Sequence, residues 1–492
     1  MPSFDGLSRS LGVLAAILGT FAAGVYWRAG LTLSHYDAKA HLVVSRRIFD
    51  SLTPSWEQIG AVWLPLPHVI NAIPVQIDFF YRTGAFGIGI SIVSFAITVA
   101  CVSAMVRSLT GSRTGALLAA ALFALNPNVL YLQSTPMTEP LLFALTSLAA
   151  LRLVEWAKSD LPAAQPIAGW TIVAACLTRY EAWPIVGAAV VAAAFFKWRN
   201  GLPAVAVIHE SARLAVYPIA TVIFFMGMSF ASTGEWFVTG GFYVPDPKLQ
   251  GQVSAVYEAI RDGLTDLAGS RFVTATTYAI PLLAIAALIR RNWSGLLIPI
   301  ALAASAALPF YAFYSGHPFR IRYEVPLILG GAACIGAAVS LLRFAAPLVA
   351  APLLVGVVLQ ASPFDREAAM IVEAQLDQNV SGRRVVTECL TRSYDGTTIM
   401  ASMGSLAHYM QELSPAGFDL ADFIHEGSGP IWQHAYYFEP SLLAGWVLVE
   451  EAAEGGDMLY RKGKSWPGFL AAYDRVCEGG NVALYKRKTL RP

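Results

Sequence analysis

The chain has 492 residues, of which 56% are hydrophobic and 14% charged, and its mean hydropathy is +0.54. Soluble globular chains carry roughly 25% charged residues, so this composition excludes a wholly soluble enzyme. The balance of 34 Lys and Arg against 33 Asp and Glu gives a net charge of +1, which provides no overall field that would attract nucleic acid.

The charges are unevenly distributed along the chain. Residues 363–492 hold 29 of the 67 charged side chains, and the first 362 residues hold the other 38. We therefore expect a transmembrane domain over 1–362 and a soluble extracytoplasmic α/β domain over 363–492. The transmembrane domain is expected to carry two long outer loops, 28–85 and 232–275.

Apolar segments of membrane-spanning length follow one another through the first part of the chain. A spanning helix needs about 20 mostly apolar residues. This criterion predicts a polytopic α-helical membrane protein of about eleven helices, near 11–27, 86–106, 115–133, 139–157, 166–178, 183–197, 214–231, 274–289, 294–312, 323–342 and 345–361. The apolar segment Trp63–Phe80 contains three prolines and Asp78, and we interpret it as an interfacial or re-entrant piece.

Basic residues orient these helices. Short gaps between alternate helices are rich in Lys and Arg, for example Arg107 and Arg113, or Arg290 and Arg291. Such gaps face the cytoplasm. The sequence therefore predicts a multi-pass protein of the cell (inner or plasma) membrane with a cytoplasmic N-terminus and an extracytoplasmic C-terminal domain. The first helix is expected to be an uncleaved anchor.

Asp37 follows the first helix and opens the first outer loop. The residues after it, 38–52, are amphipathic and predict a short helix lying in the plane of the membrane interface. Asp37 is a candidate catalytic carboxylate, and the alternative is a simple N-cap. His35 and His41 flank it, which makes a minimal ligand set for a divalent metal, although we expect no cofactor and a metal-independent protein.

Three further groups of polar residues fall on the same outer side. Glu139 lies at the start of the fourth helix, where the alternative role is to complement the helix dipole. Arg179, Tyr180 and Glu181 join two short helices, and the Arg–Glu pair would alternatively lock those helices together. The last group precedes the tenth helix, where unspecific contact with lipid head groups is the alternative, and comprises His317, Arg320, Arg322, Tyr323 and Glu324.

Carboxylates, arginines and a histidine at an outer membrane face suit transfer from a lipid-phosphate donor. Arginine binds phosphate in a bidentate manner and keeps its charge. A carboxylate can deprotonate an acceptor hydroxyl as oxocarbenium character develops on the sugar. Ionisable residues at membrane depth are functional candidates by default. Together, the four groups predict one site for a glycosyl phosphate.

These residues resemble the GT-C superfamily of membrane glycosyltransferases. The closer similarity is to its polyprenyl-phosphate-sugar branch, which includes protein O-mannosyltransferases and aminoarabinose transferases. It covers roughly residues 5–345 and is carried by Asp37 after an uncleaved first helix, by Met137-Thr138-Glu139-Pro140, and by Arg322-Tyr323-Glu324-Val325-Pro326. One departure is Ala38, which stands where some relatives have a second carboxylate.

The resemblance implies a role for each group. Asp37 and Glu139 would be catalytic, Asp37 as general base or acceptor-orienting carboxylate. Arg320 and Arg322, with His317, would bind the donor phosphate. Substrate contacts would come from Arg179, Glu181, Tyr180, His41 and Tyr323. The expected partners are a polyprenyl-phosphate-linked sugar, the lipid bilayer and an unidentified acceptor, without nucleic acid.

The region 363–492 alternates strand-like and helical runs. Strands are predicted at Arg384–Glu388, Trp446–Glu450 and Val482–Tyr485, and helices at Ile399–Leu413 and Pro467–Val476. Its aromatic and acidic segment 423–440 suits sugar binding, or alternatively a packed loop. Cys389 and Cys477 lie on the outer side, as one disulfide or as two free thiols.

Three other functions remain open at this stage. A ligase or polymerase that moves a lipid-linked oligosaccharide would need a larger outer platform than the loop at 232–275. A transporter or flippase of lipid-linked sugars would place its charges at mid-bilayer. A membrane scaffold without catalytic activity would tolerate the change Asp37→Asn.

Overall fold

The computed structural model describes residues 4–159, 163–238, 244–377 and 379–488. The chain divides into two compact units, each built from segments that are distant in the sequence. The helical unit consists of Met1–Thr32, Ile88–Gly227 and Pro245–Glu373, and the mixed unit consists of Leu33–Gly87, Met228–Val244 and Ala374–Pro492. The first outer loop thus belongs to the same unit as the C-terminal region.

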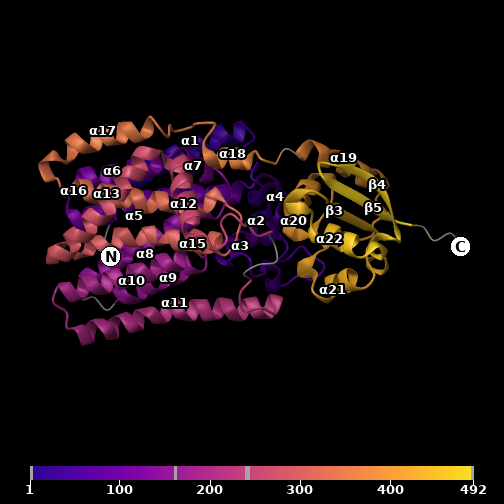
Figure 1. Ribbon diagram of the computed structural model, residues 1–492, viewed down its shortest axis with the longest axis horizontal. Coiled ribbons are helices and arrows are strands. Elements are labelled where there is room, and N and C mark those ends of the chain that lie inside the picture. The colour runs from indigo at the N-terminus through magenta and orange to yellow at the C-terminus, as the bar shows by residue number, and fades with distance from the viewer. Residues whose placement is uncertain (1–3, 160–162, 239–243, 378, 489–492) are drawn as a thin grey trace. The chain divides into compact units, whose positions relative to one another are not determined.

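Long apolar helices form most of the helical unit. Among the described residues, seven helical segments are long and apolar enough to cross a membrane. Five are single helices: α1 (Gly6–Arg28), α5 (Ala85–Thr110), α8 (Glu139–Lys158), α11 (Ala204–Thr233) and α13 (Ser270–Ile289). The other two, Arg291–Tyr314 and Ile321–Ser340, contain α14 (Leu297–Leu302), α15 (Ala307–Tyr314) and α16 (Pro326–Ser340). The prediction of a polytopic helical membrane protein is confirmed (Figure 1).

Shorter helices complete this unit. They are α6 (Arg113–Ala124), α7 (Pro127–Leu132), α9 (Ala164–Cys176), α10 (Ala182–Arg199), α12 (Val253–Ala268), α17 (Ala346–Val358) and α18 (Ala369–Ala374). Each of the eleven predicted spans falls on helical segments, but the predicted span 115–133 is divided. Asn126 accepts hydrogen bonds from the backbone N–H groups of Asn128 (2.9 Å) and Val129 (3.2 Å) and so caps a new helix, α7.

Small residues let the central helices approach closely. Every residue of α16 is buried. A Cβ atom on Gly115 of α6 would lie 1.9 Å from Ser340 Oγ and 2.3 Å from the Gly336 carbonyl oxygen, both on α16. Contacts between backbones at small residues are the usual way in which membrane helices associate. The pair α6–α16 therefore forms a rigid centre in the helical unit.

The mixed unit is built on a five-stranded sheet of order β2-β1-β3-β5-β4. Its strands are β1 (Ile399–Ala401), β2 (Phe423–Ile424), β3 (Trp446–Glu450), β4 (Tyr473–Gly479) and β5 (Val482–Arg487). β1 pairs in parallel with β2 and β3, whereas β5 pairs antiparallel with β3 and β4. The helices are α2 (Tyr36–Arg46), α3 (Leu66–Ala72), α4 (Asp78–Thr83), α19 (Val380–Ser393), α20 (Met403–Leu413), α21 (Pro430–Tyr437) and α22 (Met458–Ser465) (Figure 1).

The C-terminal predictions are right in part. The predicted strands at Trp446–Glu450 and Val482–Tyr485 are confirmed by β3 and β5. The strand predicted at Arg384–Glu388 is wrong, because those residues lie in α19 and direct Val386 and Leu390 into one core. The predicted helix at Pro467–Val476 is also wrong, since a single 3-10 turn there leads into β4.

The interfacial helix predicted at 38–52 is wrong. The helix α2 is shorter, and all residues from Asp37 to Arg46 are buried. Its apolar residues Leu42 and Val43 belong to the same core cluster as Leu406 and Met410 of α20. The amphipathic pattern reflects contact with another part of the chain rather than with lipid. Exposed apolar side chains of residues 33–87 lie outside α2, both before α3 and from α3 to α4; they are Phe49, Trp56, Val62, Val69, Ile73, Ile77 and Phe79.

Candidate functional site

Arg179 is the centre of a buried cluster of charges in the helical unit. Its Nη2 lies 2.6 Å from Glu181 Oε1, and its Nε donates to the same carboxylate at 3.1 and 3.2 Å. Its Nη1 lies 2.9 Å from Glu139 Oε1 and donates to Thr138 Oγ1 at 2.8 Å. Glu139 and Glu181 are 0% and 1% exposed. One guanidinium therefore holds two carboxylates that are 42 residues apart in the sequence.

The ends of three helices position this cluster. Glu139 opens α8 with Pro140 in the first turn, where proline is tolerated because its missing N–H has no helical partner. Arg179 and Glu181 occupy the short link between α9, which ends at Cys176, and α10, which begins at Ala182. Tyr180 points its ring edge-on to Trp183 and Phe225. The arginine thus ties the start of α8 to the link between α9 and α10.

Arg322 lies close enough to Arg179 to repel it electrostatically. The Arg322 side chain is buried, with its guanidinium carbon 5.7 Å from the centre of the Tyr323 ring. The Tyr323 hydroxyl lies 3.4 Å from His317 Nε2, whose other ring nitrogen is 2.7 Å from the Pro318 carbonyl oxygen. Arg320 is half-buried. The structure thus brings together Glu139, Arg179, Glu181 and Arg322, with His317 and Tyr323 beside Arg322.

Glu324 is a buried carboxylate to which the sequence analysis gave no role. It is 0% exposed, and neither carboxylate oxygen has a hydrogen-bond partner among the described residues. A Cβ atom on Gly263 of α12 would lie 2.2 Å from Glu324 Oε2, so a larger residue there would force the Glu324 carboxylate to move. The signal in the sequence was its place in a loop of four ionisable residues, His317, Arg320, Arg322 and Glu324.

Asp37 belongs to the mixed unit and lies in the first turn of α2. Its side chain is buried, and its backbone N–H donates to His35 Nδ1 at 3.1 Å. His35, not Asp37, is therefore the N-cap of the helix. His41 packs its ring against Trp63, 4.2 Å between centres, and against His68, 5.3 Å between centres. The described part of the chain contains no group of three or more His, Cys, Asp or Glu residues arranged to hold a metal ion.

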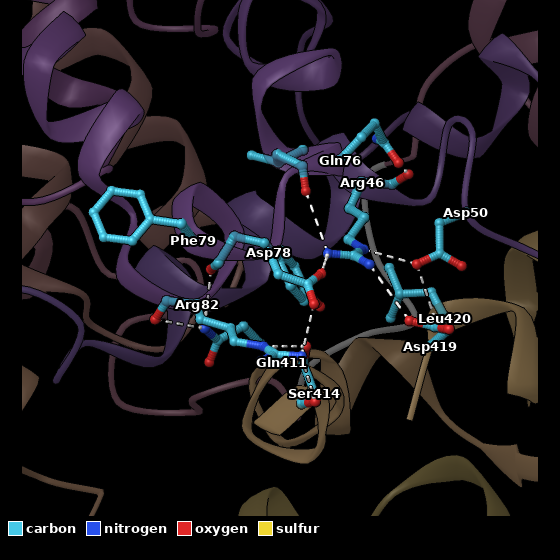
Figure 2. Close-up of polar contacts among 12 residues, drawn as sticks. Arg46, Asp50, Gln76, Asp78, Phe79, Arg82, Gln411, Ser414, Asp419 and Leu420 are labelled. Atoms are coloured by element: carbon cyan, nitrogen blue, oxygen red, sulfur yellow. Dashed lines mark hydrogen bonds and ion pairs between the residues drawn. The ribbon is translucent and has the colours of Figure 1, made fainter. Parts of the chain in front are cut away.

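Two sets of ion pairs hold α2 within the mixed unit. At its C-terminal end, Arg46 contacts Asp50 (2.7 Å), Asp78 (2.8 Å) and Asp419 (3.4 Å), as Figure 2 shows. Near its start, Lys39 Nζ lies 2.6 Å from Glu412 of α20. Sequence reasoning missed these residues, because Glu412 and Asp419 lie 373 positions after Lys39 and Arg46. The helix that carries Asp37 is therefore anchored to the C-terminal region through two buried cations, Lys39 and Arg46.

The carboxylates around Arg46 show the effect of its charge. The hydrogen bond from Arg46 lowers the pKa of Asp78, against a smaller opposing effect of burial. Asp50 in turn accepts hydrogen bonds from the backbone N–H groups of Leu420 (3.3 Å) and Ala421 (3.0 Å) (Figure 2). These contacts join residues of the first outer loop to residues nearly 370 positions later.

No protein-family model and no curated protein sequence matches the chain. Among solved structures, the fold is similar to the "Crystal Structure of ArnT from Cupriavidus metallidurans bound to Undecaprenyl phosphate", with a TM-score of 0.61. The similarity covers 96% of this chain and 98% of that chain at 11% sequence identity. It shows that this chain and that protein share their fold over nearly the whole of both chains.

Proposed function

We propose that this protein is a membrane glycosyltransferase that moves a single sugar from a polyprenyl-phosphate donor to an acceptor hydroxyl on the extracytoplasmic face. The observation that carries the proposal is the buried cluster of Glu139, Arg179, Glu181 and Arg322, set at the ends of apolar helices. The proposal is supported by the fold similarity to a protein crystallised with undecaprenyl phosphate. The polyprenyl tail of such a donor would lie in the bilayer.

Each part of the reaction has a candidate among the site residues predicted from the sequence. We propose that Arg322 and Arg320, with His317, hold the donor phosphate, because guanidinium groups pair with phosphate in a bidentate manner. As the bond between the anomeric carbon and the phosphate oxygen breaks, the acceptor oxygen bonds to that carbon. Asp37 takes the hydroxyl proton. The lipid phosphate leaves with the electron pair, so no metal is required by this scheme.

The remaining predicted contacts complete the proposal. Glu139 and Glu181 keep Arg179 fixed between them, and the edge of Tyr180 and the Tyr323 ring border the same cluster. We propose that Arg179, Glu181 and Tyr180 border the sugar. We also propose that His41, whose ring packs against Trp63, contacts the substrate. The acceptor is a hydroxyl compound of unassigned class, and the membrane is the cell membrane with the mixed unit outside.

A transfer assay tests the function. The full-length protein, purified in detergent, is incubated with radiolabelled polyprenyl-phosphate mannose, arabinose or glucose and a fraction of extracted lipids, glycans and proteins as acceptors. We expect label to move from one donor to the acceptor fraction, with and without EDTA. Loss of transfer in EDTA would overturn the metal-free scheme. Absence of transfer from every donor by folded protein would overturn the glycosyltransferase proposal.

Two variants test the assigned roles. Arg322→Gln should raise the KM for the donor by about 10-fold or more, since a charge-assisted bond to the phosphate is lost. Asp37→Asn should lower kcat by about 10²–10⁴, the range of general base catalysis. The control is Arg261→Gln, because Arg261 is exposed and pairs only with its neighbour Asp262 among the described residues. Equal activity of all three variants would refute the assigned site.

A further inference from the structure

Cys389 and Cys477 lie against each other in the mixed unit. Cys389 Sγ is 3.9 Å from the carbonyl oxygen of Val476, the residue that precedes Cys477. Cys477 Sγ is 3.9 Å from the carbonyl oxygen of Val385. In an α-helix that carbonyl accepts the backbone N–H of the residue four positions later, which is Cys389. Cys389 Sγ therefore lies beside the backbone of β4, next to Cys477. Cys477 Sγ lies beside the backbone of α19, in the helical turn that ends at Cys389.

Glycines explain why a helix and a strand come this close. A Cβ atom on Gly382 of α19 would lie 2.2 Å from the backbone nitrogen of Gly480, and one on Gly479 would lie 2.3 Å from the Gly382 carbonyl oxygen. The helix α19 thus lies directly on the turn between β4 and β5. Disulfides need Cα atoms within about 4.4–6.8 Å of each other, and this backbone contact brings the helix that carries Cys389 close to the strand that carries Cys477.

The strand is also shaped so that Cys477 turns toward the helix. The register between β4 and β5 shifts between Arg475 and Cys477, which leaves Val476 as an extra residue. Such a bulge redirects the next side chain. Val476 is exposed, whereas Cys477 and Cys389 are both half-buried against the core cluster that contains Leu390 and Leu484. Burial, followed by contact with Cys389, raises the pKa of the Cys477 thiol to about 11.

We propose that Cys389 and Cys477 form a disulfide that ties α19 to β4 in the mature protein. The two thiols lose two protons and two electrons, and one S–S bond forms. The electrons pass to a disulfide of the extracytoplasmic compartment, either an oxidised dithiol protein or a small disulfide such as oxidised glutathione, which becomes two thiols. The other cysteines, Cys101, Cys176 and Cys334, are buried in membrane helices and stay reduced.

Counting the accessible thiols of the whole protein tests this proposal. The protein is denatured and labelled with a polyethylene-glycol maleimide, either directly or after reduction, and we expect three labels before reduction and five after it. In a parallel sample, the membranes are first treated with a small permeant alkylating reagent, which blocks the accessible free thiols. Cys389→Ser should give four labels in both conditions. Five labels without reduction from the wild-type protein would overturn the disulfide.

Thermal unfolding separates a structural bond from a chance oxidation. The reduced wild-type protein should unfold at a Tm about 5–10 °C lower than the oxidised protein, since a native disulfide restricts the unfolded chain. The double variant Cys389→Ser/Cys477→Ser is the matched control, and its Tm should not respond to the reductant. A wild-type Tm that is equally insensitive would contradict a bond that ties α19 to β4. Neither measurement depends on sugar transfer, so the disulfide and the proposed function fail independently.

Discussion

Arg179 is buried with two glutamates, and its removal leaves both carboxylates without their cation. Breaking a buried ion pair by removing one partner costs about 3–5 kcal/mol, so Arg179→Gln should unfold at a clearly lower Tm in detergent. Arg179→Lys should recover part of this loss, because the lysine keeps the charge but not the bidentate contact with Glu181.

The exposed residue Arg261 again provides a control, because its replacement by Gln should leave the Tm unchanged within about 1 °C. If Arg179→Gln unfolded at the wild-type Tm but lost donor binding, Arg179 would act on the substrate rather than lock the helices. The measured Tm thus distinguishes the two roles considered for this residue.

Three buried histidines, His68, His408 and His425, make the mixed unit sensitive to acid, because burial lowers the pKa of each. Burial, followed by repulsion from Arg47, lowers the pKa of His68 to about 3. Burial, followed by repulsion from Arg383, lowers the pKa of His408 to about 4. Because these folded-state values lie below the ordinary value of 6.5, protonation favours unfolding. Their contribution to stability is complete above pH 6.5 and is lost as the pH falls toward 4.

At pH 5 the loss is up to about 2 kcal/mol for each histidine, at 1.36 kcal/mol per pKa unit. Hydrogen exchange of peptides from the mixed unit at pH 7 and pH 5 measures this loss. The double variant His68→Gln/His408→Gln should reduce the difference between the two pH values. Burial raises the pKa of Asp377, but the hydrogen bond and charge of Arg383, with smaller effects of His408 and the Asn379 backbone, together lower it to about 2, so Asp377 titrates below this window. An unchanged pH dependence in the variant would contradict the assignment.

At the scale of elements, α2 depends on Arg46. Arg46→Met keeps the apolar stem of the side chain but removes the cation from Asp50 and Asp419 and leaves Asp78 with Arg82 alone. We expect amide exchange in Tyr36–Arg46 to become about 10–100-fold faster, which corresponds to about 1.4–2.8 kcal/mol.

Arg82→Met is the matched control for this change. Arg82 also pairs with Asp78, but it is 39% exposed, and exposed pairs contribute about 0–1 kcal/mol (Figure 2). Exchange of α2 should therefore stay close to that of the wild type. Similar exchange rates for the two variants would mean that Arg46 does not anchor α2.

The same element shows where sequence reasoning succeeds and fails. Apolar segments such as 139–157 are recognisable because a membrane helix needs a continuous apolar run. The pattern around Leu42 and Val43 is equally suited to a lipid surface and to a protein partner, and its partner α20 lies more than 350 residues later. Nothing in the sequence near Arg46 or Lys39 indicates that Asp419 and Glu412 are their partners.

The candidate cluster was predictable for a similar reason. Glu139, Arg179, Glu181 and Arg322 are ionisable residues at helix ends, where the composition is otherwise apolar, so each is conspicuous in the sequence. Their pairing was not predictable in detail, since one arginine serving two glutamates depends on how α8 packs beside α9 and α10. Glu324 had no assigned role because its setting depends on Gly263 of α12.

At the scale of the whole molecule, the mixed unit is built mainly from Leu33–Gly87 and Ala374–Pro492. A smaller third segment, Met228–Val244, also belongs to it. Removing residues 374–492 would expose Leu42, Val43 and Tyr81, which are at most 1% exposed in the complete chain. We expect limited proteolysis to cut 33–87 rapidly in the truncated protein and slowly in the full-length protein. Equal resistance in both would show that the first outer loop folds without the C-terminal region.

This division of the mixed unit has a consequence for biosynthesis. Residues 33–87 leave the ribosome early, but the strands and helices that cover them are made only after the last membrane helix. At about 5–20 residues per second, the intervening stretch of roughly 300 residues takes about 15–60 s to synthesise. During that interval the apolar face of α2 has no partner of its own. Newly made chains should therefore need a chaperone that covers this apolar face until translation ends.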